Sequence, residues 1–250
     1  MKQSSTFLLS LAFMSSLTTR AFAASTIAEA TQTDSKYSFT TGDKTFLLNG
    51  KPFIIKAAEI HYPRIPRQYW EHRIKMCKAL GMNTICIYIF WNLHEQREGV
   101  YDFTGQKDIA EFCRLAKKNG MYVIVRPGPY VCAEWEMGGL PWWLLKKKDI
   151  RLRDQDPYFI SSVDRFEKKV AEQLAPLTIQ RGGPIIMVQV ENEYSSYGEN
   201  KAYVSQIPTY CASIGTRHPT ITLQLNLSHY SNATGTQTLR RADSTTWYGQ

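Results

Sequence analysis

The stretch that most constrains the fold lies at residues 182–194. A Gly-Gly-Pro turn leads into a short β-branched and apolar run, which ends in the polar side chains of Gln189, Glu191, Asn192 and Glu193. An apolar run bounded by turn residues predicts a buried strand. Carboxylates at the end of a buried strand are costly unless they are paired or functional. We therefore expect a functional site at the carboxyl-terminal end of this strand.

The segment that precedes this stretch repeats a strand followed by a helix. Strands are expected at 54–60, 84–90, 121–125 and 182–194, and helices at 66–80, 109–118 and 157–174. Strands that alternate with helices predict parallel βα units, and polar residues at the strand ends favour a (β/α)8 barrel, an α/β fold of the TIM-barrel type. A doubly wound sheet is the rival fold, but it usually has a Gly-rich phosphate loop after its first strand, and the sequence has no such loop there.

The N-terminal region has features of export. A basic start is followed by an apolar run at residues 7–14, which is too short to span a bilayer, and residues 21–23 have the small-x-small pattern of a cleavage site. We predict a signal peptide at residues 1–23, cleavage after Ala23, export to the periplasm or the extracellular space, and no membrane span. Residues 24–40 are rich in Ser, Thr and Ala and are predicted to form a flexible leader. An Asn-Gly turn predicts a hairpin at residues 46–53.

Charge and cysteine content argue against a nucleic-acid partner and against a metal site built from cysteines. The net charge is +8, but basic residues cluster only at 146–148, with Arg151 and Arg153 nearby. No nucleic-acid-binding motif accompanies the cluster, so we interpret it as a solvated loop and expect no nucleic-acid partner. The five cysteines have no CxxC or metal-ligand spacing, so buried free thiols are expected.

The strand ends carry the residue types that a glycosidase needs. Hydrolysis with retention uses two carboxyl groups about 5 Å apart, one as acid and base and the other as nucleophile. Glu193 is the candidate acid/base, and Asn192 beside it could hydrogen-bond a sugar 2-hydroxyl group. The other candidates for the pocket are Glu134 and Glu191 as acceptors from sugar hydroxyl groups, and Tyr88 and Trp91 as lining residues.

These polar residues have three other interpretations. The glutamates could instead form a structural network with Arg126 and Lys56, and for Glu95 and Glu136 this alternative stays open. The five histidines have no HExxH or similar spacing, which leaves a metal site without support. A nucleophilic triad of the α/β-hydrolase type would need a Gly-x-Ser-x-Gly elbow, and the sequence contains none.

Long motifs at these strand ends resemble those of a known family. The chain is similar to β-galactosidases of glycoside hydrolase family 35, which belong to a clan of retaining (β/α)8-barrel glycosidases. The resemblance covers about residues 40 to 206 and rests on residues 59–64, 88–95, 126–144 and 182–194.

The resemblance implies a function and a set of site residues. It implies hydrolysis of terminal non-reducing β-D-galactose from β-galactosides with retention, on an oligosaccharide or glycan substrate and without a cofactor. Glu193 is implied as the proton donor. The residues implied to contact galactose are Tyr88, Cys132, Ala133, Glu134 and Asn192.

The character of the sequence changes near residue 207. The tail becomes rich in Ser, Thr, Asn and Arg, and a fifth strand is expected at 221–227. In the family the nucleophile follows the seventh strand, which by the usual spacing would lie beyond residue 250. We expect a truncated or frame-shifted gene, with residues 41–206 as the N-terminal half to two-thirds of the barrel and 207–250 as a divergent, non-native tail. A divergent half-barrel module is the alternative, and we expect the chain to be poorly stable by itself.

Two functional alternatives follow from this expectation. One is a remnant that binds galactosides without cleaving them, because only one catalytic carboxylate is identified. The other is a glycosidase of the same clan with a different sugar preference.

Overall fold

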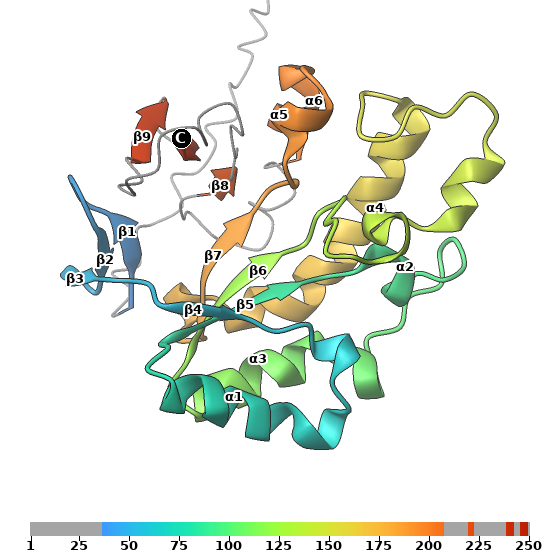
Figure 1. The fold of residues 1–250 in the computed structure, drawn as a ribbon. Coiled ribbons are helices and arrows are strands. Elements are labelled where there is room, and N and C mark those ends of the chain that lie inside the picture. Colours follow the sequence, from blue (N-terminus) through green and yellow to red (C-terminus); the bar gives the residue numbers. More distant parts are fainter. Residues whose placement is uncertain (1–36, 208–219, 223–238, 243–245, 250) are drawn as a thin grey trace, which may run out of the picture. The chain divides into compact units, whose positions relative to one another are not determined.

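The structure is a computed structural model that describes residues 37–207, 220–222, 239–242 and 246–249 (Figure 1). The predicted signal peptide, most of the predicted leader and most of the segment after residue 207 lie outside the described residues. No helix in the described part of the chain is long and apolar enough to cross a membrane.

A small antiparallel sheet precedes the repeated units. It contains β1 (Phe39–Thr41), β2 (Phe46–Leu48) and β3 (Lys51–Phe53), in that order. Asn49 and Gly50 join β2 to β3 with φ of 51° and 75°, which confirms the predicted hairpin turn. The predicted leader extended too far, because β1 begins at Phe39. The Phe39 ring is fully buried and stacks on Phe46 with their centroids 5.3 Å apart, so apolar packing orders the end of that segment.

The larger sheet has seven strands among the described residues. Its order is β4-β5-β6-β7-β8-β10-β9, with β4 to β8 and β10 parallel and β9 antiparallel to β10. This arrangement confirms the predicted parallel βα units. The strands are β4 (Ala57–Glu59), β5 (Thr84–Tyr88), β6 (Tyr122–Arg126), β7 (Ile185–Gln189), β8 (Thr220–Thr222), β9 (Leu239–Ala242) and β10 (Thr246–Gly249). β8 coincides with the start of the predicted fifth strand, whose remaining residues are not described.

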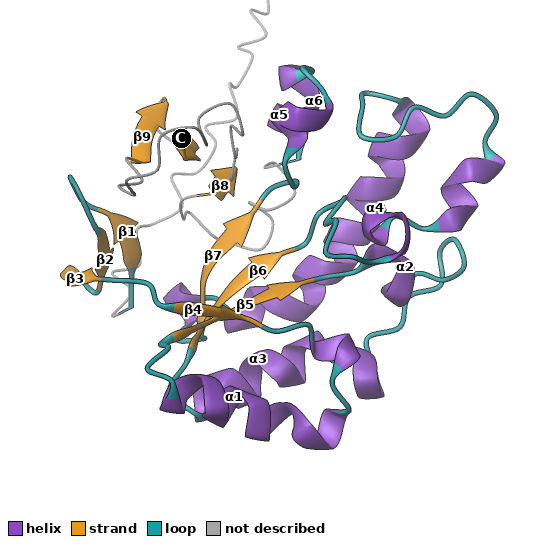
Figure 2. Ribbon diagram, in the orientation of Figure 1, coloured by secondary structure: helices purple, strands orange, loops and turns teal. Residues whose placement is uncertain are grey.

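Helices alternate with the parallel strands along the chain (Figure 2). The helices are α1 (Trp70–Ala79), α2 (Trp91–His94), α3 (Ile109–Lys118), α4 (Pro157–Leu174), α5 (Tyr194–Tyr197) and α6 (Lys201–Gln206). α3 and α4 have the predicted bounds. Asp108 and Asp156 begin these two helices by accepting backbone N–H groups of the first turn. α1 begins later than predicted because a 3-10 turn at Arg67–Tyr69 follows Pro66.

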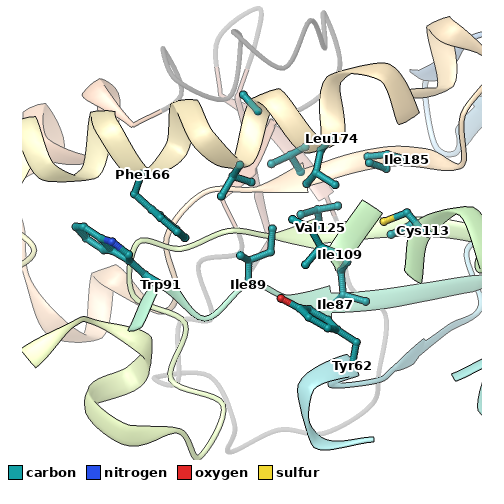
Figure 3. Packing of buried hydrophobic residues seen from close by; sticks show 14 of the residues in the cluster. Tyr62, Ile87, Ile89, Trp91, Ile109, Cys113, Val125, Phe166, Leu174 and Ile185 are labelled. Atoms are coloured by element: carbon teal, nitrogen blue, oxygen red, sulfur yellow. The ribbon is translucent and has the colours of Figure 1, made fainter. Parts of the chain in front are cut away.

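The parallel strands bury apolar side chains on both faces, as strands of a covered parallel sheet do. Val125 of β6 lies in the main core together with side chains of α3 and α4 (Figure 3). Val123 of β6 and two residues of α1, Trp70 and Ile74, belong to the same cluster. The alternate residues Tyr122 and Ile124 pack in a second cluster with Phe39 of the small sheet. The two-residue period of a strand therefore divides β6 between the two clusters.

The first strand of this sheet is not buried, which corrects the prediction for residues 54–60. Ile54 is 73% exposed, and Ala57 and Glu59 are exposed as well. β4 lies at the end of the strand order and pairs only with β5 among the described strands. An edge strand loses less of its surface to neighbours than a central one, so apolar composition alone overestimates its burial.

Candidate active site

Parallel strands bring residues from distant parts of the sequence to one edge. We call the carboxyl-terminal ends of β4 to β7 the carboxyl edge of the sheet. Glu59 ends β4, Tyr88 ends β5 and Arg126 ends β6, and Tyr88 and Arg126 are direct partners in the strand register. The chain leaves β7 at this edge and enters α5 (Figure 1). An open groove of about 510 Å³ runs from Glu59 and His61 along α1, and none of the predicted site residues lines it.

Arg126 joins the side chains of three other segments at the carboxyl edge. Its Nη1 donates to Glu59 Oε2 over 2.9 Å and also to the Tyr88 hydroxyl group. Its Nη2 donates to Asn192 Oδ1 over 2.6 Å. The hydrogen bond with His61, and then the charge of Arg126, lower the pKa of Glu59, so that carboxylate stays ionised. Burial raises the pKa of Tyr88, so its hydroxyl group stays protonated.

Glu193 follows β7 in a left-handed conformation with φ of 50°. Its side chain is half-buried, and no hydrogen bond or ion pair joins its carboxylate to another residue in the described part of the chain. Left-handed backbone is unfavourable for a residue with a Cβ atom, and Glu191 shares it with φ of 56°, so it is the unpaired carboxylate that distinguishes Glu193. Glu193 thus differs from Glu59 and Glu191, whose carboxylates are paired within the protein, in being available to a ligand.

Glu191, only two residues earlier, has the opposite environment. It is 2% exposed, and Arg153 donates to both of its oxygens, from Nε over 3.0 Å and from Nη2 over 2.6 Å. The Tyr203 hydroxyl group and the backbone N–H of Asn192 each donate to it over 2.7 Å. The expectation that Glu191 accepts from sugar hydroxyl groups is wrong. Its carboxylate is buried, and residues of the protein already donate to both of its oxygens.

Arg153 is a site residue that the sequence analysis missed. We had interpreted it as part of a solvated basic loop, but it is 5% exposed. Its guanidinium carbon lies 4.0 Å from the Tyr130 ring centroid and 4.1 Å from that of Tyr197, and Nη2 donates to the Asn192 carbonyl oxygen over 2.6 Å. Arg153 and Glu191 are 38 residues apart, so no local sequence signal indicates their pairing.

The loop after β6 carries three of the predicted sugar contacts. Cys132, Ala133 and Glu134 have φ of 58°, 55° and 47°, three consecutive left-handed residues. Cys132 is half-buried, Ala133 is buried and Glu134 is exposed. Arg64 supports the loop, because its Nη2 donates to the Glu134 carbonyl oxygen over 2.6 Å and its guanidinium group lies over the Trp135 ring.

Trp91 does not line a pocket, which corrects a second expectation. Its ring is fully buried and stacks on Phe166, with centroids 5.2 Å apart and planes 15° apart (Figure 3). Its Nε1 donates to Glu95 Oε2 over 2.6 Å, and the Gly99 backbone N–H donates to Glu95 Oε1 over 2.7 Å. Glu95 therefore has the structural role that we had left open. Glu136 is exposed, and its carbonyl oxygen accepts from Asn92 over 3.1 Å.

Comparison with solved structures concerns the fold. An exo-beta-1,4-mannosidase from Opitutaceae bacterium strain TAV5 has a TM-score of 0.58 and 16% identity, covering 76% of this chain and 34% of that chain. An endo-1,4-beta-mannanase from Rhizomucor miehei has a TM-score of 0.54 and 16% identity, covering 74% and 60% respectively. At identities this low, the comparison concerns the fold alone. That fold is the α/β barrel type predicted from the sequence, and part of it is present here.

Comparison with sequences identifies the family. A protein of Xanthomonas manihotis named Beta-galactosidase is 46% identical over 178 residues, which are 71% of this chain and 30% of that protein. Beta-galactosidase of Mus musculus is 51% identical over 152 residues, 61% of this chain and 24% of that protein. The chain thus spans less than a third of the length of these relatives. The family model described as glycosyl hydrolases family 35 matches residues 45–247, beyond residue 206, where we had placed the end of the resemblance. The chain belongs to the glycosyl hydrolases of family 35.

Proposed function

We propose that the protein hydrolyses terminal non-reducing β-D-galactose residues from β-galactosides with retention, and that Glu193 is its acid/base. The observation that carries the proposal is the contrast between two neighbouring carboxylates. Glu191 is enclosed by Arg153 and Tyr203, whereas the Glu193 carboxylate has no partner among the described residues. The names of the relatives support galactose as the sugar.

The proposed chemistry assigns Glu193 two steps. It first protonates the glycosidic oxygen as the leaving group departs, and it then removes a proton from the water that hydrolyses the glycosyl-enzyme intermediate. A second carboxylate must attack the anomeric carbon to form that intermediate. Asn192 donates to the sugar 2-hydroxyl group. Further galactose contacts come from Tyr88, Cys132, Ala133 and Glu134.

Binding without turnover is the second candidate function. Three carboxylates near the carboxyl edge have partners within the protein. Glu59 bonds Arg126, Glu95 bonds Trp91, and Glu191 bonds Arg153. None of these three is free to act as the nucleophile. The Glu134 carboxylate is exposed and has no partner among the described residues, but it is assigned here to galactose contact, so only one member of the catalytic pair is identified.

Release of nitrophenol from nitrophenyl β-galactoside by purified residues 24–250 tests the proposal. The Glu193→Gln variant should lose activity by more than a hundredfold, and Glu199→Gln, a matched change at an exposed glutamate, should keep it. Turnover that survives in Glu193→Gln would contradict the assignment of the acid/base. No turnover by a folded native chain that binds galactose in a calorimeter would favour the binding function instead.

Two further properties are proposed with this function. Parallel assays with nitrophenyl glucoside and mannoside should give rates well below that with the galactoside, because the proposed sugar is galactose. We also propose export by the signal peptide at residues 1–23. N-terminal sequencing of protein recovered from the periplasm or the medium should then begin at Ala24, and an intact N-terminus starting at the first methionine would oppose export.

A further inference from the structure

We propose that Arg126 is a positioning residue that fixes the side-chain amide of Asn192, with the amide oxygen toward the guanidinium group and the amide NH2 group toward the sugar. Arg126 would then act on the ligand through Asn192. The inference rests on the proposed function, since it takes Asn192 to be a galactose contact.

The polarity of the Arg126–Asn192 contact follows from the chemistry of the two groups. A guanidinium group has five N–H donors and no acceptor. The Asn192 atom that lies 2.6 Å from Arg126 Nη2 must therefore be Oδ1, and the NH2 group is the end that remains for a ligand. Asn192 is 6% exposed, so little water is available to compensate a rotated amide.

The backbone of Asn192 is held as firmly as its side chain. Its N–H donates to Glu191 Oε2 over 2.7 Å, and its carbonyl oxygen accepts from Arg153 over 2.6 Å. Arg126 thus holds the side chain of Asn192, and Arg153 holds its backbone. With the backbone fixed in this way, the hydrogen bond from Arg126 determines which way the amide faces.

Arg126 is itself held by the ends of two neighbouring strands. Nη1 donates to Glu59 of β4 and to the hydroxyl group of Tyr88 of β5, and the guanidinium carbon lies 4.0 Å from the centroid of the Tyr88 ring. The planar guanidinium group can donate to several acceptors at once, and the single ammonium group of lysine cannot reproduce that geometry. The side chain of Arg126 is 16% exposed, whereas that of Glu59 is 41% exposed, so the contact to Glu59 is open to solvent.

A fixed amide polarity has a consequence for the ligand. Asn192 presents its NH2 group as a donor to a sugar hydroxyl oxygen, while its amide oxygen is turned to Arg126. Asn192→Asp would keep an acceptor for Arg126 and lose the donor for the sugar. A galactoside without its 2-hydroxyl group would lose the same hydrogen bond from the other side.

A double-mutant cycle on the purified chain tests whether Arg126 acts through Asn192. The probe is methyl β-galactoside in a calorimeter, with Arg126→Met, Asn192→Ala and the double variant. We expect Arg126→Met to weaken binding about tenfold in the native background and less than about twofold when Asn192 is already alanine. Additive losses would overturn the proposal. Arg114→Met, at an exposed arginine of α3, is the matched control and should bind as the native chain does.

Two conservative variants keep the test valid if Arg126→Met does not fold. Asn192→Asp should retain the native melting temperature within a few degrees and lose at least tenfold in affinity, because the contact to Arg126 persists without the donor. Unchanged affinity would contradict the assigned polarity. Arg126→Lys should weaken binding to a similar degree while the circular dichroism spectrum stays native.

A measurement without sugar separates this proposal from the proposed function. The side-chain NH2 resonances of Asn192, identified by their loss in Asn192→Asp, should shift in Arg126→Lys and stay in place in Arg114→Met. Resonances that do not move in Arg126→Lys would refute the positioning role. If the native chain binds no galactoside at all, the proposed function fails, and the resonances alone decide the role of Arg126.

Discussion

Arg153 and Glu191 form a two-point ion pair in the interior, with Nε 3.0 Å from Oε1 and Nη2 2.6 Å from Oε2. The two residues are 5% and 2% exposed. Both charges have been removed from water, so each depends on the other for compensation. Glu191 is two residues before the proposed acid/base Glu193, and it accepts from the backbone N–H of Asn192 between them.

Removing one partner of this pair should destabilise the fold strongly. Glu191→Ala and Arg153→Met should each lower the free energy of unfolding by about 3–5 kcal/mol, because each leaves an uncompensated buried charge. Urea unfolding of purified variants measures this. Arg151→Met removes an arginine whose side chain is 65% exposed and which pairs with Asp154, and it should cost less than about 1 kcal/mol. Equal losses in the buried and exposed variants would contradict the prediction.

Buried His94 should make stability depend on pH in the acid range. Its Nδ1 donates to the Asp102 carbonyl oxygen over 2.9 Å, and its Nε2 accepts from the Tyr62 hydroxyl group over 2.5 Å, which is the neutral form. Burial, with a smaller contribution from Lys107, lowers the pKa of His94 from 6.5 to about 4. The neutral ring thus stabilises the native state fully above pH 6.5, and that stabilisation, about 3 kcal/mol, is lost as the pH falls from 6.5 to 4.

Two matched histidine variants isolate this effect from other acid-sensitive groups. Urea unfolding between pH 7.5 and pH 4 should show a shallower loss of stability for His94→Gln than for the native chain. His72→Gln, at an exposed histidine of α1, should keep the native slope. A native slope in both variants would mean that His94 does not carry the pH dependence.

The ring stack between Trp91 and Phe166 predicts a large packing loss. Phe166 of α4 is fully buried against Trp91, the first residue of α2, so Phe166→Ala leaves a cavity in the main core. Thermal or urea unfolding should give a loss of about 3–5 kcal/mol. Ile54→Ala removes an apolar side chain that is 73% exposed and should change stability by less than about 0.5 kcal/mol. A small effect of Phe166→Ala would count against the packing described for this core.

The cap of the longest helix gives a smaller and more local prediction. Asp156 Oδ1 accepts from the backbone N–H groups of Tyr158 and Phe159 over 3.0 and 3.1 Å. Asp156→Ala should cost about 1 kcal/mol, and Asp156→Asn should recover most of that loss because the amide oxygen still accepts. Glu172→Ala, at an exposed position in the last turn of α4, serves as the control. A larger loss for Asn than for Ala would show that Asp156 acts by its charge and not as a cap.

Much of the fold could be predicted because its signals are local. The Asp-Pro pair at the start of α4 fixes the helix start within two residues, and the Asn-Gly pair fixes the hairpin turn. β4 was harder, because its exposure depends on which strands lie beside it and not on its own residues.

The site could be predicted only in part, and Glu191 and Glu193 illustrate the reason. Both are glutamates at the end of one strand, and both were expected to contact sugar or its glycosidic bond. What separates them is Arg153, 38 residues away from Glu191, whose position at this strand end is set by tertiary structure. Trp91 is a similar case, because an aromatic residue after a strand suits a pocket and a core equally well until Phe166 packs against it.

The left-handed backbone at Cys132, Ala133 and Glu134 restricts how an engineer could change sugar preference. Glycine, asparagine and aspartate tolerate such φ values, whereas β-branched and bulky residues do so poorly. A library that randomises these positions would consist mainly of variants with a misfolded loop. Tyr88 is in the regular backbone of β5, so its φ imposes no such restriction, but its side chain is 7% exposed and its hydroxyl group accepts from Arg126. Backbone conformation therefore restricts substitutions in the loop after β6, whereas side-chain packing restricts them at Tyr88.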